Sequence, residues 1–196
     1  MVTRSRVHAV RTLVVVGAVV ATAVFATGLS AGAKTASRGT ALANLKITKD
    51  QVSVKVKGAS TFAAAKAGQA LHQGDTIKTD TDGQAEINYT DGSLTRLANS
   101  TVFTLSKLTN ERGGRQTQGT LSVGETWNRA AKVSETGSFE VKAGGTTAAV
   151  EGTAFVVKCV PKTDGTQQVT CTVTAVVDDI KVSSDDWDVT SVTSAP

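Results

Sequence analysis

Short runs in which apolar and polar residues alternate, separated by Asp-Gly pairs, constrain the fold of this chain more than any other feature. The clearest run, residues 84–90, lies between the pairs Asp82-Gly83 and Asp91-Gly92. Alternation with a period of two is typical of half-buried strands, and Asp-Gly favours the tight turns that join antiparallel strands. The pattern therefore predicts an all-β fold, a single domain of many short strands in a sandwich or a rolled, β-solenoid-like sheet.

Strand signals continue along most of the chain. We expect strands at residues 51–57, 75–79, 84–90, 93–98, 101–108, 119–124, 125–133, 138–143, 146–150, 152–160, 167–177 and 179–184. Only the alanine-rich residues 61–71 are compatible with a helix, which we expect to have at most a turn or two. Residues 34–47 have the composition of a linker, and residues 185–196 form a polar tail that we expect to fray. The β-domain is therefore expected at residues 48–184.

The N-terminal residues 1–33 have the pattern of an export helix. Arginines 4, 6 and 11 precede an uncharged stretch, residues 12–33. Its apolar part, Leu13–Phe25, fits the core of a signal peptide, and Ala31-Gly32-Ala33 fits a cleavage site. The uncharged stretch is also long enough to span a bilayer, which needs about 20 residues. Residues 1–33 are therefore a signal peptide or an uncleaved membrane anchor. The domain is extracytoplasmic in either case, secreted or periplasmic after cleavage, or held in the cytoplasmic membrane through residues 12–33.

The positive charge of the chain does not indicate a nucleic-acid partner. The net charge is +4, but without residues 1–33 it falls to +1, with 18 Lys and Arg against 17 Asp and Glu. The remaining basic residues are interspersed with acidic ones, so no patch forms that could displace counterions from a phosphate backbone.

The two cysteines are placed to form a disulfide. Cys159 and Cys171 flank the pair Asp164-Gly165. A three-residue loop at 164–166 puts the two cysteines directly opposite each other on neighbouring strands. An oxidising compartment favours the disulfide, although two reduced buried thiols remain the alternative. Zinc is disfavoured because His72 is the one histidine left after residues 1–33.

Residues that could carry catalysis are sparse. Asp91-Gly92-Ser93 contains a serine, but a nucleophilic serine needs a base, and His72 shows no orienting partner in the sequence, so we interpret the triplet as a turn. Asp80 and Asp82 resemble the start of a calcium loop, yet the position that requires glutamate holds Asp91. We therefore expect no catalytic, cofactor-binding or metal-binding residues and no enzymatic activity.

Three aromatic side chains are candidates for contacts with a ligand. Trp127, Tyr89 and Trp187 could act as stacking surfaces for a carbohydrate. For Trp127, packing in the core or at a sheet edge is the preferred interpretation.

The order of the segments GDTIKT, GQAEINYTDGSLTRL, LSVGETW and FEVKAGGTTAAVEGTAFVV resembles the FecR domain family. The resemblance covers about residues 74–184. The residues that carry it, which we interpret as structural, are Gly74, Asp75, Asp91, Gly92, Ser93, Gly124, Trp127, Gly152, Thr153 and Phe155.

This resemblance implies an extracytoplasmic, mostly β domain of the kind found in regulators of iron uptake. In those regulators a cytoplasmic N-terminal region binds a sigma factor, and the exterior domain receives a signal from a transporter. Here residues 1–10 are too short to fold a sigma-binding unit, and Asp178-Asp179 stands where the family usually has a glycine. We therefore expect a non-enzymatic protein-binding or sensory module of the cell envelope with a role in signalling, whose partner is an unknown envelope protein or polysaccharide. The alternative is a carbohydrate- or peptidoglycan-binding envelope module.

Overall fold

The computed structural model describes residues 40–111, 114–131, 137–150, 152–164, 166, 168–177, 181–184 and 192–194. These residues belong to one compact unit, Ser37–Pro196, which we call the β-unit. The export segment predicted at residues 1–33 lies outside the described residues. Within them, no helix is long and apolar enough to cross a bilayer.

The β-unit is built from strands, as predicted, and the described part of the chain contains no helix. Its strands are β1 (Ala43–Lys49), β2 (Val52–Lys55), β3 (Ala63–Ala64), β4 (Ala70–Leu71), β5 (Thr76–Thr79), β6 (Gln84–Tyr89), β7 (Leu94–Leu97), β8 (Val102–Glu111), β9 (Gly114–Arg129), β10 (Ser138–Ala143), β11 (Thr146–Val150), β12 (Ala154–Pro161), β13 (Val169–Val177), β14 (Lys181–Ser184) and β15 (Val192–Ser194).

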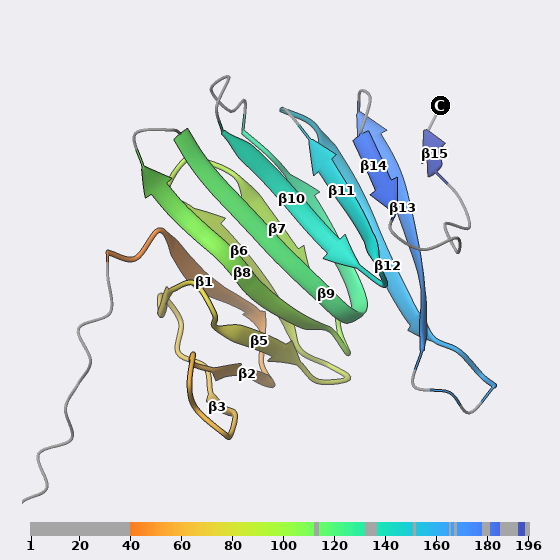
Figure 1. The fold of residues 1–196 in the computed structure, drawn as a ribbon. Coiled ribbons are helices and arrows are strands. Elements are labelled where there is room, and N and C mark those ends of the chain that lie inside the picture. Colours follow the sequence, from red (N-terminus) through yellow and green to blue (C-terminus); the bar gives the residue numbers. More distant parts are fainter. Residues whose placement is uncertain are drawn as a thin grey trace, which may run out of the picture. The chain divides into compact units, whose positions relative to one another are not determined.

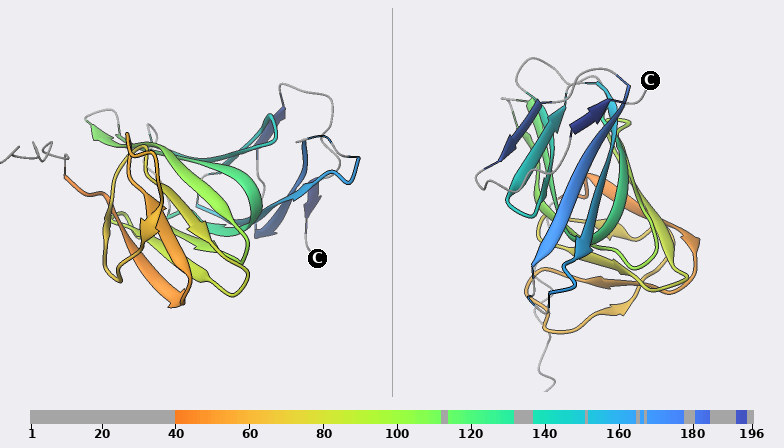
Figure 2. Two further views of the ribbon diagram at one scale, coloured as in Figure 1. Left: turned by 90° about the horizontal axis from the view of Figure 1, so that it is seen from below. Right: turned by 90° about the vertical axis from the view of Figure 1, so that its right-hand side faces the viewer.

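Two sheets share the long strand β9. The first, sheet A, has the order β4-β1-β6-β7-β9-β12-β13-β15, and the second, sheet B, has the order β3-β2-β5-β8-β9-β10-β11-β14. Neighbouring strands are antiparallel except in the pairs β9–β10 and β13–β15. Figures 1 and 2 show the two layers and the passage of β9 between them. The β-unit is therefore a curled sheet that folds over on itself, in agreement with the predicted fold class.

Strand β9 changes its inward face near Gly124. In its first half the buried residues are at odd positions, as at Gly119 and Leu121, whereas in its second half they are at even positions, as at Thr126 and Asn128. Gly124 has φ +98°, a conformation that residues with a Cβ rarely adopt. The same strand can therefore contribute side chains to the core first from sheet B and then from sheet A.

The core lies between the two sheets and holds aromatic side chains at its centre. Phe139 from sheet B packs edge-on against Tyr89 and Phe155 from sheet A, with ring centroids 5.6 and 6.3 Å away. Such edge-to-face pairs contribute about 0.5–1.5 kcal/mol beyond the burial of their area. The other fully buried large side chains are Leu45, Leu71, Ile77, Ile87, Leu97, Phe103, Leu105, Leu121, Val141 and Val157.

The described structure differs from the expected local structure at four places. Residues 43–47, expected in the linker, belong to β1, in which Ala43 and Leu45 are buried. The two strands expected at 119–124 and 125–133 are one strand, β9, that begins at Gly114. Residues 61–71 form no helical turn but contain the short strands β3 and β4. The tail expected to fray at 185–196 contains β15, which pairs with β13.

The hairpin of β12 and β13 has the predicted register. Cys159 lies directly opposite Cys171, and Pro161 lies opposite Val169. The two sulfur atoms are at disulfide distance, 2.13 Å apart. Gly165, in the predicted loop at 164–166, lies outside the described residues. The Cys171 sulfur also lies against Gly144 in the turn between β10 and β11, where an added Cβ would meet it at 2.8 Å. The disulfide therefore lies where the two sheets approach each other.

Candidate functional site

The outer face of sheet A carries a row of polar and aromatic side chains on four neighbouring strands. Lys46 of β1 pairs with Glu86 of β6, which pairs with Arg96 of β7, which pairs with Trp127 of β9. In a strand, alternate residues point to opposite faces, and the neighbours of these residues in sequence face the core. The register of sheet A therefore brings the four side chains together on one surface, which we call the Trp127 face.

Glu86 is held between two cations. Its Oε2 accepts a hydrogen bond from Arg96 Nε at 2.9 Å, and its Oε1 accepts one from Lys46 Nζ at 3.3 Å. The hydrogen bond from Arg96 lowers the pKa of Glu86 below its ordinary value, burial opposes this shift, and Lys46 reinforces it. Glu86 is therefore an anion that fixes the position of Arg96.

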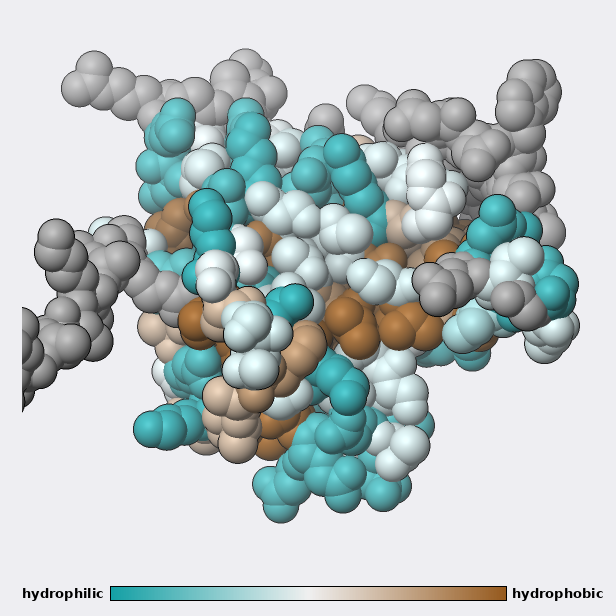
Figure 3. Space-filling view, turned by 60° about the horizontal axis from the view of Figure 1, so that its bottom comes forward, coloured by the Kyte–Doolittle hydropathy of each residue, from teal (hydrophilic) through white to brown (hydrophobic). Residues whose placement is uncertain are grey.

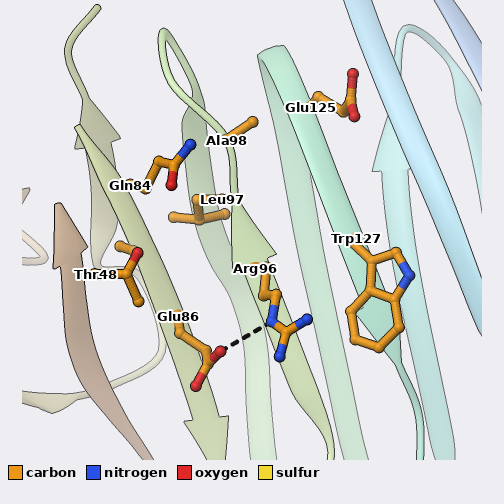
Figure 4. A pocket seen from close by; sticks show the side chains of 9 residues that line it. Thr48, Gln84, Glu86, Arg96, Leu97, Ala98, Glu125 and Trp127 are labelled. Carbon is orange, nitrogen blue, oxygen red and sulfur yellow. Dashed lines mark hydrogen bonds and ion pairs between the residues drawn. The ribbon is translucent and has the colours of Figure 1, made fainter. Parts of the chain in front are cut away.

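Arg96 also lies over the indole ring of Trp127. Its guanidinium carbon is 5.0 Å from the ring centroid, within the range of a cation–π interaction. Figure 4 shows the two side chains side by side, with Arg96 between Glu86 and Trp127. Trp127 is half-buried, and Arg96 keeps 59% of its side-chain surface exposed. An oriented guanidinium and an accessible aromatic ring thus occupy neighbouring positions.

The row borders a shallow hollow. A cavity of about 400 Å³ is lined by Thr48, Gln84, Glu86, Arg96, Glu125 and Trp127. Figure 4 shows these side chains arranged over β1, β6, β7 and β9. At one side of the hollow Lys158 of β12 forms an ion pair with Glu125, with Nζ 3.1 Å from Oε2. The hollow offers charged groups of both signs around one aromatic ring.

The residues of the predicted Asp91-Gly92-Ser93 turn do form a turn between β6 and β7. Asp91 Oδ1 accepts hydrogen bonds from the Ser93 amide at 2.9 Å, and it pairs with Arg115 Nη1 at 3.1 Å. Ser93 Oγ accepts a hydrogen bond from the amide of Ala131 at 2.9 Å. Both polar side chains are thus engaged in holding the turn against β9.

Gly74 and Asp75 lie in the turn before β5. The buried carboxylate of Asp75 accepts hydrogen bonds from the amides of Lys57 at 2.9 Å and His72 at 3.0 Å, and the Gly74 amide donates to Leu105 O at 2.7 Å. The sequence showed no orienting partner for His72, but its Nδ1 lies 3.9 Å from Asp75 Oδ2. The Asp75 carboxylate binds the backbone amides of both Lys57 and His72, so it joins the two chain segments that contain these residues.

The other motif residues lie in or beside the core. Thr153 and Phe155 are buried, and the Thr153 carbonyl accepts a hydrogen bond from the Ala130 amide at 2.9 Å. Gly152 lies just before Thr153, at the entry to β12. Of the ten residues that carry the family resemblance, Trp127 alone belongs to the Trp127 face.

The predicted aromatic stacking surfaces have different positions. Tyr89 is 4% exposed, and its hydroxyl is 3.3 Å from Thr95 Oγ1, so its ring cannot receive a ligand and this prediction was wrong. Trp187 lies outside the described residues. Trp127 is accessible on the outer face of sheet A.

Sequence reasoning missed Glu86, Arg96 and Lys46. A signal for the first two was present, because a hairpin centred on Asp91 places residues 86 and 96 opposite each other. The approach of Arg96 to Trp127 depends on the pairing of β7 with β9, for which the sequence holds no local signal.

No group of three or more His, Cys, Asp or Glu side chains gathers to hold a metal ion in the part of the chain that the structure describes. Asp80, at the start of the loop that resembles a calcium site, instead forms an ion pair with Lys78 at 3.0 Å. The described residues thus offer binding by charge, hydrogen bonding and aromatic contact.

A family model described as FecR protein matches residues 75–177, more than half of the chain. No curated protein and no solved structure matches. The match includes β6, β7, β9 and β12, the strands that carry Glu86, Arg96, Trp127 and Lys158. It thus contains most of the Trp127 face.

Proposed function

Because the chain belongs to the FecR family, we propose that it is a non-enzymatic sensory module of the cell envelope that binds another protein through the Trp127 face. Membership of this family supports a regulatory or signalling role in the envelope. The cysteine pair at disulfide distance agrees with an oxidising compartment outside the cytoplasm. The mature unit is either released after cleavage or held in the membrane by residues 12–33.

The observation that carries this proposal is the contact of Arg96 with Trp127. Arginine and tryptophan are the side chains most enriched among residues that dominate the binding energy of protein interfaces. Nε of Arg96 donates a hydrogen bond to Glu86. The two terminal nitrogens of Arg96 have no hydrogen-bond partner among the residues described. These nitrogens can donate to a carboxylate or a carbonyl of a partner, while Trp127 supplies apolar contact area.

The rim of the hollow supports the same proposal. Glu125 and Lys158, near the half-buried Trp127, and Lys46, at the other end of the row, are charged and accessible. A central aromatic contact with a polar rim is the usual anatomy of a protein interface. The rim charges set the orientation and rate of association more than the affinity.

The proposal can be tested by site-specific crosslinking in intact cells. A photoreactive amino acid placed at Trp127 should crosslink to one envelope protein. The same amino acid at Thr147, a half-buried position on β11 in sheet B, is the matched control and should not form that crosslink. The captured protein is then purified and its affinity for the chain is measured directly.

In that measurement Trp127→Ala and Arg96→Ala should each weaken binding by about 30-fold, the effect of losing a residue worth about 2 kcal/mol. Thr147→Ala should leave the affinity unchanged. Equal affinities for all three variants would contradict the proposal. If purified peptidoglycan or another polysaccharide were retained by the wild type and lost with Trp127→Ala, the carbohydrate-binding alternative would replace it.

A further inference from the structure

We propose that a second surface of the β-unit, formed by the segment between β2 and β4, contacts an anionic lipid bilayer. This surface, which we call the Phe62 surface, comprises residues 55–66. The inference goes beyond the protein-binding role proposed above and uses none of the residues of the Trp127 face. It rests on the location of the β-unit in the cell envelope.

The Phe62 surface exposes several apolar side chains to solvent. Every residue from Val56 to Ala64 is exposed, and among them Val56 keeps 36% and Phe62 keeps 38% of its surface accessible. Ala59, Ala63 and Ala64 add small apolar side chains. Figure 3, turned so that this end of the β-unit comes forward, shows hydrophobic surface here bordered by hydrophilic residues. Exposed aromatic and aliphatic side chains gathered on one segment mark sites of contact with a membrane or with another protein.

The charge of this segment complements an anionic surface. Residues 51–74 contain Lys55, Lys57 and Lys66 and no aspartate or glutamate. None of the three ammonium groups forms an ion pair with a residue that the structure describes, and Lys55 Nζ lies 5.3 Å from the centroid of the Phe62 ring. Lysines beside an inserted aromatic ring can reach lipid phosphates while their aliphatic stems remain in contact with apolar groups.

The strand that follows the Phe62 surface in sequence, β4, lies beside the start of β1, where the N-terminal part of the chain enters the β-unit. Ala43 in β1 pairs with Leu71 in β4, and the amide of Leu45 donates to Gln69 O at 2.9 Å. The apolar part of the predicted export segment ends at Phe25, and 17 residues lie between Phe25 and Ala43. An extended chain of that length reaches roughly 60 Å at most, so a retained anchor would keep the Phe62 surface within reach of the bilayer.

A second copy of this chain fits the Phe62 surface less well than a bilayer does. A two-fold symmetric contact would place three lysines of one copy against three lysines of the other, which is unfavourable. An anionic bilayer supplies the opposite charge together with an apolar interior for Phe62 and Val56.

The test uses the full chain reconstituted in phosphatidylcholine vesicles with and without phosphatidylglycerol. An environment-sensitive dye is attached at Phe62→Cys and, as a control, at Asn110→Cys. Asn110 is exposed and lies at the end of β8 remote from its pairing with β5. We expect the dye at position 62 to shift to the blue and to be quenched by lipids with brominated acyl chains when phosphatidylglycerol is present. The dye at position 110 should do neither.

Replacing Lys55, Lys57 and Lys66 by glutamine should weaken the lipid-bound state of the surface by about fivefold per lysine, and so should high salt. The melting temperature of the triple variant should stay unchanged, because none of the three ammonium groups forms an ion pair with a residue that the structure describes. Equal spectra at positions 62 and 110 in anionic vesicles, or quenching that survives the triple substitution, would overturn the proposal. A shift that depends on protein density and not on lipid charge would assign the surface to a second copy, and a shift that needs an added envelope protein would assign it to that partner.

Discussion

Gly124 in β9 lies directly against Thr101: a Cβ added to Gly124 would stand 2.5 Å from the Cα of Thr101 and 2.3 Å from its Oγ1. The same Thr101 Oγ1 accepts a hydrogen bond from the Glu125 amide at 3.1 Å. The point at which β9 changes its inward face is thus fixed by the backbone before β8.

Gly124→Ala should lower the free energy of unfolding by about 2–4 kcal/mol, because the new methyl group meets backbone atoms and φ is positive. Urea unfolding measures the change. Gly92→Ala is the matched control, since Gly92 has φ +89° but open space around it. It should cost only the backbone strain, about 1 kcal/mol. Equal losses for the two variants would show that the contact with Thr101 has no effect.

Gly119→Ala should destabilise the core because the ring of Phe103 occupies the space of the missing side chain, with its Cζ 2.0 Å from an added Cβ. Overpacking of this kind costs about 1–3 kcal/mol. The double variant Gly119→Ala/Phe103→Leu should be more stable than the sum of the single effects predicts, by about 1 kcal/mol. Additive effects in this double-mutant cycle would rule out a direct contact as the cause.

The ion pairs of Glu86 should make the free energy of unfolding depend on pH in the acidic range. Its pKa in the folded state lies below the ordinary value of 4.5, chiefly through the hydrogen bond from Arg96. The stabilisation it contributes is therefore complete above pH 4.5 and is lost as the pH falls through the folded-state pKa. Glu86→Gln should reduce stability by up to about 1 kcal/mol at neutral pH and should have a smaller effect in acid. Denaturant midpoints of both proteins across this range provide the measurement, and a constant difference would contradict the ion pairing.

Tyr89 should resist ionisation until the protein unfolds. Burial raises the pKa of its hydroxyl well above the ordinary value of 10.0. The resulting contribution to stability is complete below pH 10.0 and is lost as the pH rises toward the folded-state pKa, because the unfolded chain ionises first. The chain has one tyrosine, so the absorbance of phenolate reports on Tyr89 alone.

Phenolate absorbance should therefore appear together with the loss of near-ultraviolet circular dichroism during alkaline titration. Tyr89→Phe should remove part of the dependence of unfolding on alkaline pH. Ionisation of Tyr89 near pH 10.0 in a protein that remains folded would be the contrary result.

Reduction of the Cys159–Cys171 pair should lower the melting temperature and the free energy of unfolding by about 3 kcal/mol, the estimate for closing a loop of this size. The double variant Cys159→Ala/Cys171→Ala should be insensitive to reductant. An unchanged melting temperature of the wild type under reducing conditions would show that the crosslink does not contribute.

Local patterns predicted the parts of the fold that depend on neighbours in sequence. The runs at 84–90 and 93–98 are β6 and β7, and the turn between them lies at Asp91 and Gly92 as expected. The register of Cys159 with Cys171 followed from the same reasoning. Hairpins are local, so a turn signal between two alternating runs fixes both strands and their pairing.

The expected local structure was wrong where a sequence pattern is compatible with two different structures. Gly124 was interpreted as a break between strands, whereas it lets one strand continue with its inward face reversed. In β1 the alternation of Ala43, Leu45 and Ile47 with polar residues was present, but the polar, small-residue composition before it favoured a linker. The Trp127 face depends on the pairing of β7 with β9, which joins residues about thirty positions apart. Neither segment contains a local sequence pattern that predicts this pairing.

The backbone of β9 forms hydrogen bonds in both sheets. The strands of one layer therefore cannot be separated from those of the other without breaking hydrogen bonds of β9. Opening sheet A between β7 and β9 leaves the second half of β9 paired with β12, while opening sheet B between β8 and β9 leaves the first half paired with β10. Tension applied at the Trp127 face would be carried along β9 to its pairing with β8 in the opposite layer. Load on one layer thus reaches the other through covalent bonds, so we expect the two layers to yield together.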